Sequence, residues 1–280
     1  LNDAQLATLA NLGNVDAPLG DQYGLARFPL AMAFRRLFDG DTPAGHPALA
    51  AAAVKAYSAY LFSIDGQMSY GRAQAYASVL NSMTASQKAV LDAMKGTGAG
   101  TWTQPGPEAV STILRKYPSK GDLRTYAGEM LAWYIGGTAP DVYFCPERQG
   151  TYFGSFFMKD VKAMHNPSYT IDSNMTAEMG ASFLATLTST QAARVTGLVT
   201  TQKADLLDIV SQRTLISNQL RQFLISGTAS AASVQSLARR YGELDGEISY
   251  YYAAAFSGLG LTADQRSKLM ALRKTATAET

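Results

Sequence analysis

Several residue types that build common functional sites are scarce in this sequence. Its 280 residues include one cysteine and two histidines, so the chain cannot form an internal disulfide or a histidine-rich metal site. Only 16% of the residues are charged, and 24 basic side chains nearly balance 22 acidic ones, which leaves a net charge of +2. This balance provides no basic surface of the kind that binds nucleic acid, so we expect no nucleic-acid partner.

Long apolar runs and catalytic signatures are also missing. No apolar stretch approaches the roughly 18 to 20 residues that a membrane-spanning helix requires, so we expect no membrane span. The sequence contains no glycine-rich nucleotide-binding loop, no Gly-x-Ser-x-Gly motif and no His-Glu-x-x-His motif. We therefore predict that the protein is not an enzyme, and we assign no catalytic residue.

Apolar residues, in contrast, make up 47% of the chain, which is enough to bury a sizeable core. They belong to an internal repeat whose blocks match at offsets of 186, 180 and 178 residues. The matching blocks are residues 1–5 and 187–191, residues 65–70 and 245–250, and residues 83–87 and 261–265. Because the three blocks keep their order, the sequence predicts an internal duplication.

The second copy has the apolar spacing of long helices. Residues of its seam recur every three or four positions between Val195 and Phe223. This spacing predicts a continuous helix of nearly forty residues after Thr188. A returning helix carries the same spacing from Val234, and Gly227 marks the hairpin turn between the two.

The first copy repeats this pattern with differences. Its returning helix carries the seam from Val54, and residues 40–47 are expected to form the turn. Glycine and proline in residues 13–20 predict a break in the opening helix, and Pro29 predicts a second change of direction. The sequence therefore predicts an all-α fold of two homologous antiparallel long-helix hairpin modules, which form a bundle-like pseudo-dimer.

The segment between the copies differs in composition. Residues 96–186 hold six of the ten prolines, both tryptophans and the only cysteine. Helical spacing is found there in residues 107–117 and 122–135, whereas residues 141–174 have no helical period and indicate a long ordered loop. The predicted organisation is a helical module at residues 1–95, an insert at residues 96–186 and a second helical module at residues 187–280.

A short motif recurs at four expected helix starts. Leucine or methionine is followed by threonine or asparagine and, three residues after that, by glutamine, beginning at Leu1, Met83, Leu187 and Leu261. The second side chain of the motif accepts a hydrogen bond from the backbone N–H three residues on, and the glutamine reaches back. Each motif therefore predicts the N-terminus of a helix.

Four such motifs in an alanine-rich helical chain resemble the periplasmic LTxxQ group, which includes the Spy and CpxP chaperones and related metal-responsive proteins. The resemblance covers about residues 1–95 and 187–272 and leaves out the central segment. Members of the group are small helical proteins that pair as dimers and form a cradle. The resemblance implies that this chain contains two such modules fused as a pseudo-dimer, without the strongly basic concave surface of the chaperones.

Two arginine–aspartate pairs also recur, Arg27 with Asp65 and Arg213 with Asp245. Arg213 and Asp245 stand at similar distances on either side of the predicted turn, so we expect them to face each other. Such a pair fixes the register of two facing helices, and a polar pocket beside the adjacent serine and tyrosine is the alternative. We predict that both pairs are structural.

A glycine follows the aspartate in each copy, Gly66 in the first and Gly246 in the second. Glycine within a helix costs about 1 kcal/mol relative to alanine. Its recurrence in both copies therefore predicts a close approach between helices at this position.

The central loop is rich in tyrosine and phenylalanine between residues 141 and 157. These side chains either cover the helices or form a binding face for a partner. The candidate partner-binding residues are Tyr143, Phe144, Tyr152, Phe153 and Phe156.

Sulfur ligands and one imidazole also occur close together in the insert. Thiolate, thioether and imidazole groups suit copper(I), although methionine is also an ordinary core residue and a lone cysteine can bond to a second chain. We expect no cofactor other than copper in this region. The candidate metal ligands are Cys145, Met158, Met164 and His165.

Low charge, a single cysteine and abundant small residues are typical of bacterial periplasmic or secreted proteins. The chain begins at Leu1, as a protein does after removal of its signal peptide or after trimming. We predict a non-enzymatic extracytoplasmic binding protein that acts on a protein partner or a metal ion. The alternatives are a secreted structural subunit that assembles with itself into a filament or matrix, and a copper or redox-metal carrier.

Overall fold

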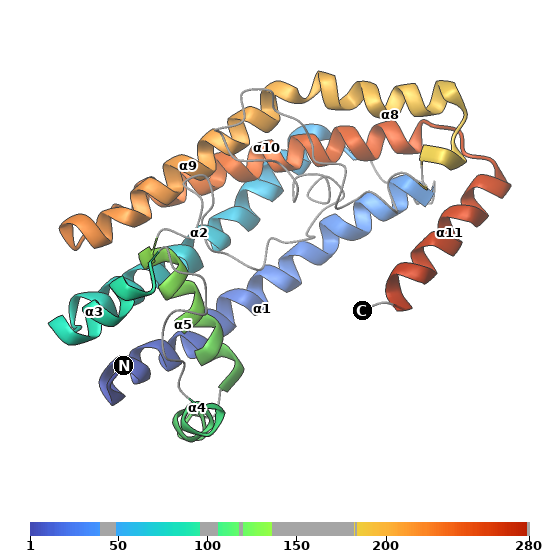
Figure 1. Cartoon of the computed structure of the whole chain (residues 1–280). Helices are drawn as coiled ribbons and strands as arrows, with labels where there is room; N and C mark the ends of the chain where they lie inside the picture. The colour runs from blue at the N-terminus through green and yellow to red at the C-terminus, as the bar shows by residue number, and fades with distance from the viewer. Residues whose placement is uncertain (40–48, 96–105, 118–119, 136–181, 183, 279–280) are drawn as a thin grey trace. The chain divides into compact units, whose positions relative to one another are not determined.

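The computed structural model describes residues 1–39, 49–95, 106–117, 120–135, 182 and 184–278. Every regular element within these residues is an α-helix, which confirms the predicted all-α class (Figure 1). The helices are α1 (Asp3–Asp39), α2 (Ala51–Asn81), α3 (Ala85–Ala93), α4 (Pro107–Leu114), α5 (Lys120–Ile135), α8 (Ser189–Thr201), α9 (Lys203–Ser226), α10 (Ala231–Ser257) and α11 (Ala263–Ala278). Within the described ranges, no helix is long and apolar enough to cross a membrane.

The described residues divide into two compact units. The first contains residues 1–24, 64–95, 106–117, 120–135 and 213–237. The second contains residues 25–39, 49–63, 182, 184–212 and 238–278. Each unit therefore takes residues from both predicted copies of the repeat.

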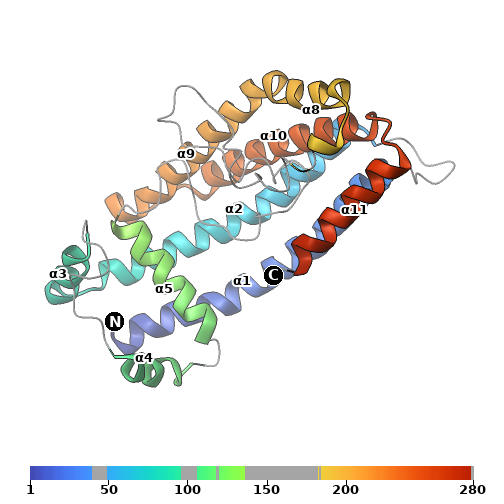
Figure 2. The same cartoon turned by 45° about the vertical axis from the view of Figure 1, so that its right-hand side comes forward.

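In the first unit, α5 lies across the N-terminal part of α1 and the C-terminal part of α2 (Figure 2). Its buried side chains are spaced three, four and three residues apart, which is the pattern of a helix with one apolar face. These side chains are Leu123, Tyr126, Met130 and Trp133. The helices α4 and α5 agree with the two helical segments predicted in the insert, and α5 carries the apolar face that packs against the module.

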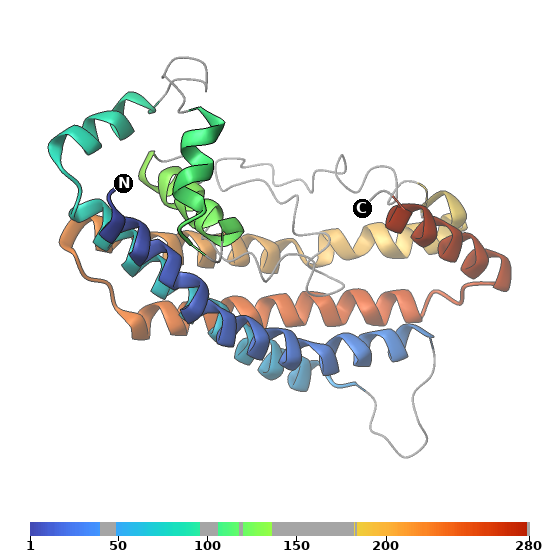
Figure 3. The ribbon, with the colours of Figure 1, turned by 90° about the horizontal axis from the view of Figure 1, so that it is seen from below.

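In the second unit, α10 runs beside α8 and the first part of α9 (Figure 3). It also packs on the first half of α2, where Gly246 lies against Val54 and Gly242 lies against Phe62. The residue numbers rise along α2 as they fall along α10, so the two helices are antiparallel. This close contact confirms the approach that Gly246 predicts.

The predicted break in the opening helix is wrong, because α1 is continuous from Asp3 to Asp39. Proline removes one backbone hydrogen bond and introduces a steric clash, but burial of an amphipathic face provides most of the stability of a helix in a protein. Leu12 and Tyr23, on either side of Pro18, are both buried. Packing therefore keeps α1 helical through its prolines.

The predicted continuous helix of the second copy is also wrong, because α8 ends at Thr201 and α9 begins at Lys203. The interruption falls at Gln202, which is buried. Its side-chain amide donates a 3.2 Å hydrogen bond to the carbonyl oxygen of Ile248 in α10. The apolar seam contains this residue and cannot show that the helix is interrupted there.

The turn predicted at Gly227 is confirmed. This residue follows the last residue of α9 and has a φ of 78°, a conformation that glycine adopts without the steric penalty of a side chain. We expect Gly227→Ala to lower the free energy of unfolding by about 1 kcal/mol. An added methyl group meets no atom within 4 Å, so the loss comes from the backbone alone.

Urea denaturation of the two proteins tests this expectation. Gly227→Asn serves as the control, because asparagine tolerates the left-handed region better than alanine. An alanine variant as stable as the wild type, or less affected than the asparagine variant, contradicts the expectation.

Candidate functional site

The four LTxxQ-like motifs all begin helices, as predicted. At α3, the Thr84 hydroxyl accepts the backbone N–H of Gln87 at 3.2 Å, and the Gln87 side chain accepts the backbone N–H of Thr84 at 2.9 Å. The same reciprocal bonds are formed at the other three helix starts. These are made by Asn2 with Gln5, by Thr188 with Gln191 and by Thr262 with Gln265.

The glutamines of these motifs also bond to each other in pairs. In the first unit, the amide of Gln87 donates to Gln5 at 2.8 Å, and that of Gln5 donates back at 3.4 Å. In the second unit, the amide of Gln265 donates to Gln191 at 2.8 Å, and that of Gln191 donates back at 3.4 Å. Each pair, which we call a glutamine clamp, joins the first and third helices of one copy.

The glutamine clamp is expected to couple the two helix ends energetically. Gln5→Ala and Gln87→Ala each remove the capping bonds and the clamp, so each should lower the free energy of unfolding by about 1 to 2 kcal/mol. Because both substitutions remove the same clamp, the double variant should lose about 0.5 to 1 kcal/mol less than the sum of the single losses. A double-mutant cycle in urea measures this coupling, and strictly additive losses contradict it.

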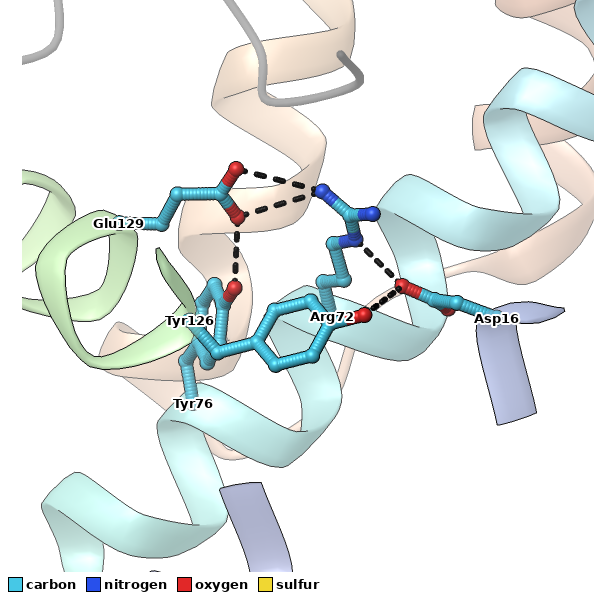
Figure 4. Close-up of polar contacts among 5 residues, drawn as sticks. All are labelled: Asp16, Arg72, Tyr76, Tyr126 and Glu129. Carbon is cyan, nitrogen blue, oxygen red and sulfur yellow. Dashed lines mark hydrogen bonds and ion pairs between the residues drawn. The ribbon is translucent and has the colours of Figure 1, made fainter. Parts of the chain in front are cut away.

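A second polar group lies in the first unit and consists of five side chains from three helices (Figure 4). We call it the Arg72 cluster. Arg72 and Tyr76 come from α2, Asp16 comes from α1, and Tyr126 and Glu129 come from α5. The side chains of Arg72 and Asp16 are only 3% and 7% exposed, and that of Glu129 is 22% exposed. The cluster therefore brings buried charges together where α5 crosses the two long helices.

Arg72 is the central group of the cluster. Its Nε donates to Asp16 Oδ2 at 2.6 Å, and its Nη1 lies 3.2 and 3.3 Å from the two carboxylate oxygens of Glu129. The guanidinium also lies over the ring of Tyr126, 5.1 Å from its centroid. One arginine therefore binds the carboxylates of two different helices and stacks on an aromatic ring.

The two tyrosine hydroxyls complete the network. Tyr76 donates to Glu129 Oε2 at 2.6 Å, and Tyr126 donates to Asp16 Oδ2 at 3.2 Å. Burial and, after it, the Glu129 carboxylate raise the pKa of Tyr76 far above its ordinary value of 10.0. The Tyr76 hydroxyl therefore remains protonated and keeps its role as a donor.

The residues at the corresponding positions of the second copy are uncharged. At the offsets of 186 and 180 residues, Gln202 corresponds to Asp16, Tyr252 to Arg72 and Phe256 to Tyr76. All three are buried in the second unit, and burial raises the pKa of Tyr252 to about 12. The ion pairs of the Arg72 cluster are thus a feature of the first copy.

Sequence reasoning missed this cluster because nothing local marks it. Asp16 precedes Arg72 by 56 residues, and Glu129 follows it by 57. The available signal is a difference between the copies, because a charged residue at position 72 stands opposite an aromatic residue at position 252.

The four residues of the predicted arginine–aspartate pairs differ in burial. Asp65, Arg213 and Asp245 are buried, and Arg27 is half-buried. Their pairing stays a prediction. The predicted metal ligands and partner-binding residues lie outside the described residues, namely Cys145, Met158, Met164, His165, Tyr143, Phe144, Tyr152, Phe153 and Phe156.

Among the residues that the structure does describe, no group of three or more histidine, cysteine, aspartate or glutamate side chains is placed to hold a metal ion. The search of protein-family models, of curated proteins and of solved structures finds no match to the chain. A proposal about function therefore depends on the residues themselves.

Proposed function

We propose that the chain is a tandem duplication of two LTxxQ-type helical modules. The starts of corresponding helices support this proposal, because they differ by the same offsets as the sequence blocks. The pairs are Asp3 of α1 and Ser189 of α8, Ala51 of α2 and Ala231 of α10, and Ala85 of α3 and Ala263 of α11. A shared origin explains why the offsets taken from short motifs also relate the helix boundaries.

The pattern of burial gives independent support. Positions of α2 and α10 that differ by 180 residues are buried in both helices, including polar ones. The matched pairs include Val54 and Val234, Asp65 and Asp245, Ser69 and Ser249, and Ala73 and Ala253. Buried polar residues are uncommon, so their recurrence at one offset favours two copies of the same module.

Contacts within each unit also support a pseudo-dimer of the two copies. In the first unit, Tyr70 of the first copy donates to the carbonyl oxygen of Ala229 at 3.2 Å and packs on the ring of Phe223 at 5.2 Å. In the second unit, Lys55 of the first copy forms a 2.6 Å ion pair with Glu247 of the second. Each unit thus contains contacts between the copies, as a fused dimer requires.

The proposed function is that of a non-enzymatic extracytoplasmic binding protein of LTxxQ type, whose partner is a protein. The observation that carries it is the glutamine clamp, because this contact gives the four motifs one shared structural role at the helix ends. The helices themselves present apolar side chains to solvent, including Leu25 and Phe28 of α1, which are 77% and 65% exposed. Exposed apolar residues on adjacent turns favour binding to apolar segments of a protein.

An aggregation assay tests this proposal. We expect the purified chain, at a molar ratio of about one to one, to delay the turbidity of reduced α-lactalbumin, which exposes apolar surface as it unfolds. Leu25→Ser with Phe28→Ser should weaken the delay. Val90→Ser, which changes an exposed residue of the short helix α3, is the matched control and should not. Turbidity that is the same with and without the chain contradicts the proposal.

Native mass spectrometry with elemental analysis separates this function from its alternatives. A metal-free monomer agrees with the binding protein, and large metal-free homo-oligomers favour the self-assembling subunit. One equivalent of copper that is lost on substitution of Cys145 and His165 favours the metal carrier.

A further inference from the structure

The apolar face of α5 does not by itself determine which copy the helix binds. This face is continuous and fully packed in the first unit. Both copies provide buried apolar side chains at corresponding positions, and these do not differ in kind. The corresponding buried residues are Leu9 and Val195, Tyr23 and Ile209, and Val79 and Leu259.

The polar groups of α5, in contrast, fit only the first copy. Glu129 accepts hydrogen bonds from Arg72 and from Tyr76, and Tyr126 donates to Asp16. At the corresponding positions, the second copy has a tyrosine in place of the arginine and a phenylalanine in place of the second hydroxyl donor. A carboxylate placed there would lose its cation on burial, which is strongly unfavourable.

We propose that Asp16, Arg72 and Tyr76 are specificity determinants that direct the insert helix α5 to the first module and keep it off the second. The proposal depends on the duplication proposed above, because that duplication defines which residues correspond. The docking surface is the crossing of α1 and α2, and the helix it fits carries a carboxylate and a tyrosine hydroxyl at the edge of an apolar face. The three residues break the symmetry between two otherwise similar modules.

A module-exchange variant tests the proposal in the full chain. Asp16→Gln, Arg72→Tyr and Tyr76→Phe together install the residues of the second copy, which that copy buries in the same fold. With Trp102→Phe, the buried Trp133 of α5 becomes the one remaining tryptophan. We expect normal helix content, a red shift of Trp133 emission, and amide exchange in residues 120–135 that is faster by about tenfold or more. Exchange in α10 should not change.

A second substitution separates specificity from general packing. Glu129→Gln should speed the exchange of α5 by about tenfold in the wild-type background, because the amide does not replace a carboxylate bound to arginine. In the module-exchange variant, where Arg72 is absent, it should have little effect. Glu108→Gln, on the exposed side of α4, is the control and should have no effect in either background.

Two results overturn the proposal in different ways. A folded module-exchange variant with unchanged Trp133 emission and unchanged exchange in α5 shows that the apolar face alone directs docking, and it leaves the duplication intact. Loss of the fold in this variant shows that the two copies do not correspond at these positions, which removes the duplication and the proposal together. Equal effects of Glu129→Gln in both backgrounds also overturn the proposed specificity.

Discussion

Arg72→Met is expected to lower the free energy of unfolding by about 3 to 5 kcal/mol, because it leaves two carboxylates without their shared cation. Asp16 is almost completely buried and its carboxylate oxygen lies 2.6 Å from Arg72 Nε. Methionine fills a similar volume, so the loss comes mainly from the charges and not from a cavity. Urea denaturation followed by far-UV circular dichroism measures the change.

Two further variants make this result specific. Tyr134→Phe removes a solvent-exposed 2.8 Å hydrogen bond to Asp92 from the same helix α5, and its unfolding midpoint should equal that of the wild type within error. Asp16→Asn combined with Arg72→Met should be more stable than Arg72→Met alone, because one of the uncompensated charges is gone. An Arg72→Met protein within about 1 kcal/mol of the wild type would show that the cluster is not a buried ionic network.

Gly242→Ala is expected to lower the free energy of unfolding by about 3 kcal/mol, because α2 and α10 are too close at this point to admit a methyl group. A Cβ atom at Gly242 would lie 2.6 Å from the carbonyl oxygen of Ser58, 2.8 Å from Phe62 Cβ and 2.9 Å from Ala59 Cα. Two of these atoms are backbone atoms, so a side-chain rotation cannot relieve the clash. Thermal and urea denaturation both measure the loss.

The matched control is a glycine in an open position of the same fold. Gly71 lies in the middle of α2, and an added Cβ there meets no atom within 4 Å. Gly71→Ala should therefore raise the free energy of unfolding by about 0.5 to 1 kcal/mol, the usual gain from replacing glycine in a helix. If both variants were stabilised, α2 and α10 would not approach each other as closely as the structure shows.

The helix boundaries were the part of the fold that local sequence signals predicted best. The capping motifs before α1, α3, α8 and α11 specify which backbone N–H groups are bonded, and this chemistry involves only four neighbouring residues. The continuity of the helices was predicted poorly. Local signals overestimated Pro18 in α1 and gave no sign of the interruption at Gln202, because the packing of other helices decides both.

The candidate site could not be predicted for a related reason. The Arg72 cluster joins three helices that are distant in the sequence, and each of its residues has an ordinary surface-like identity when read alone. The same is true of the glutamine clamps, since the motif predicts the capping role of each glutamine but not its partner in another motif. Close packing at Gly246 was predicted from its recurrence, whereas Gly242 was missed because the first copy has Phe62 at that position.

The two glutamine clamps respond differently to solution conditions from the ion pairs of the chain. Carboxamides carry no net charge and do not titrate in the range where proteins fold, and salt does not screen their hydrogen bonds as it screens exposed charges. An ion pair such as that between Lys55 and Glu247 weakens as ionic strength rises or as the carboxylate is protonated. The first and third helices of each copy are therefore joined by contacts that hold in dilute buffer, in high salt and in mild acid alike.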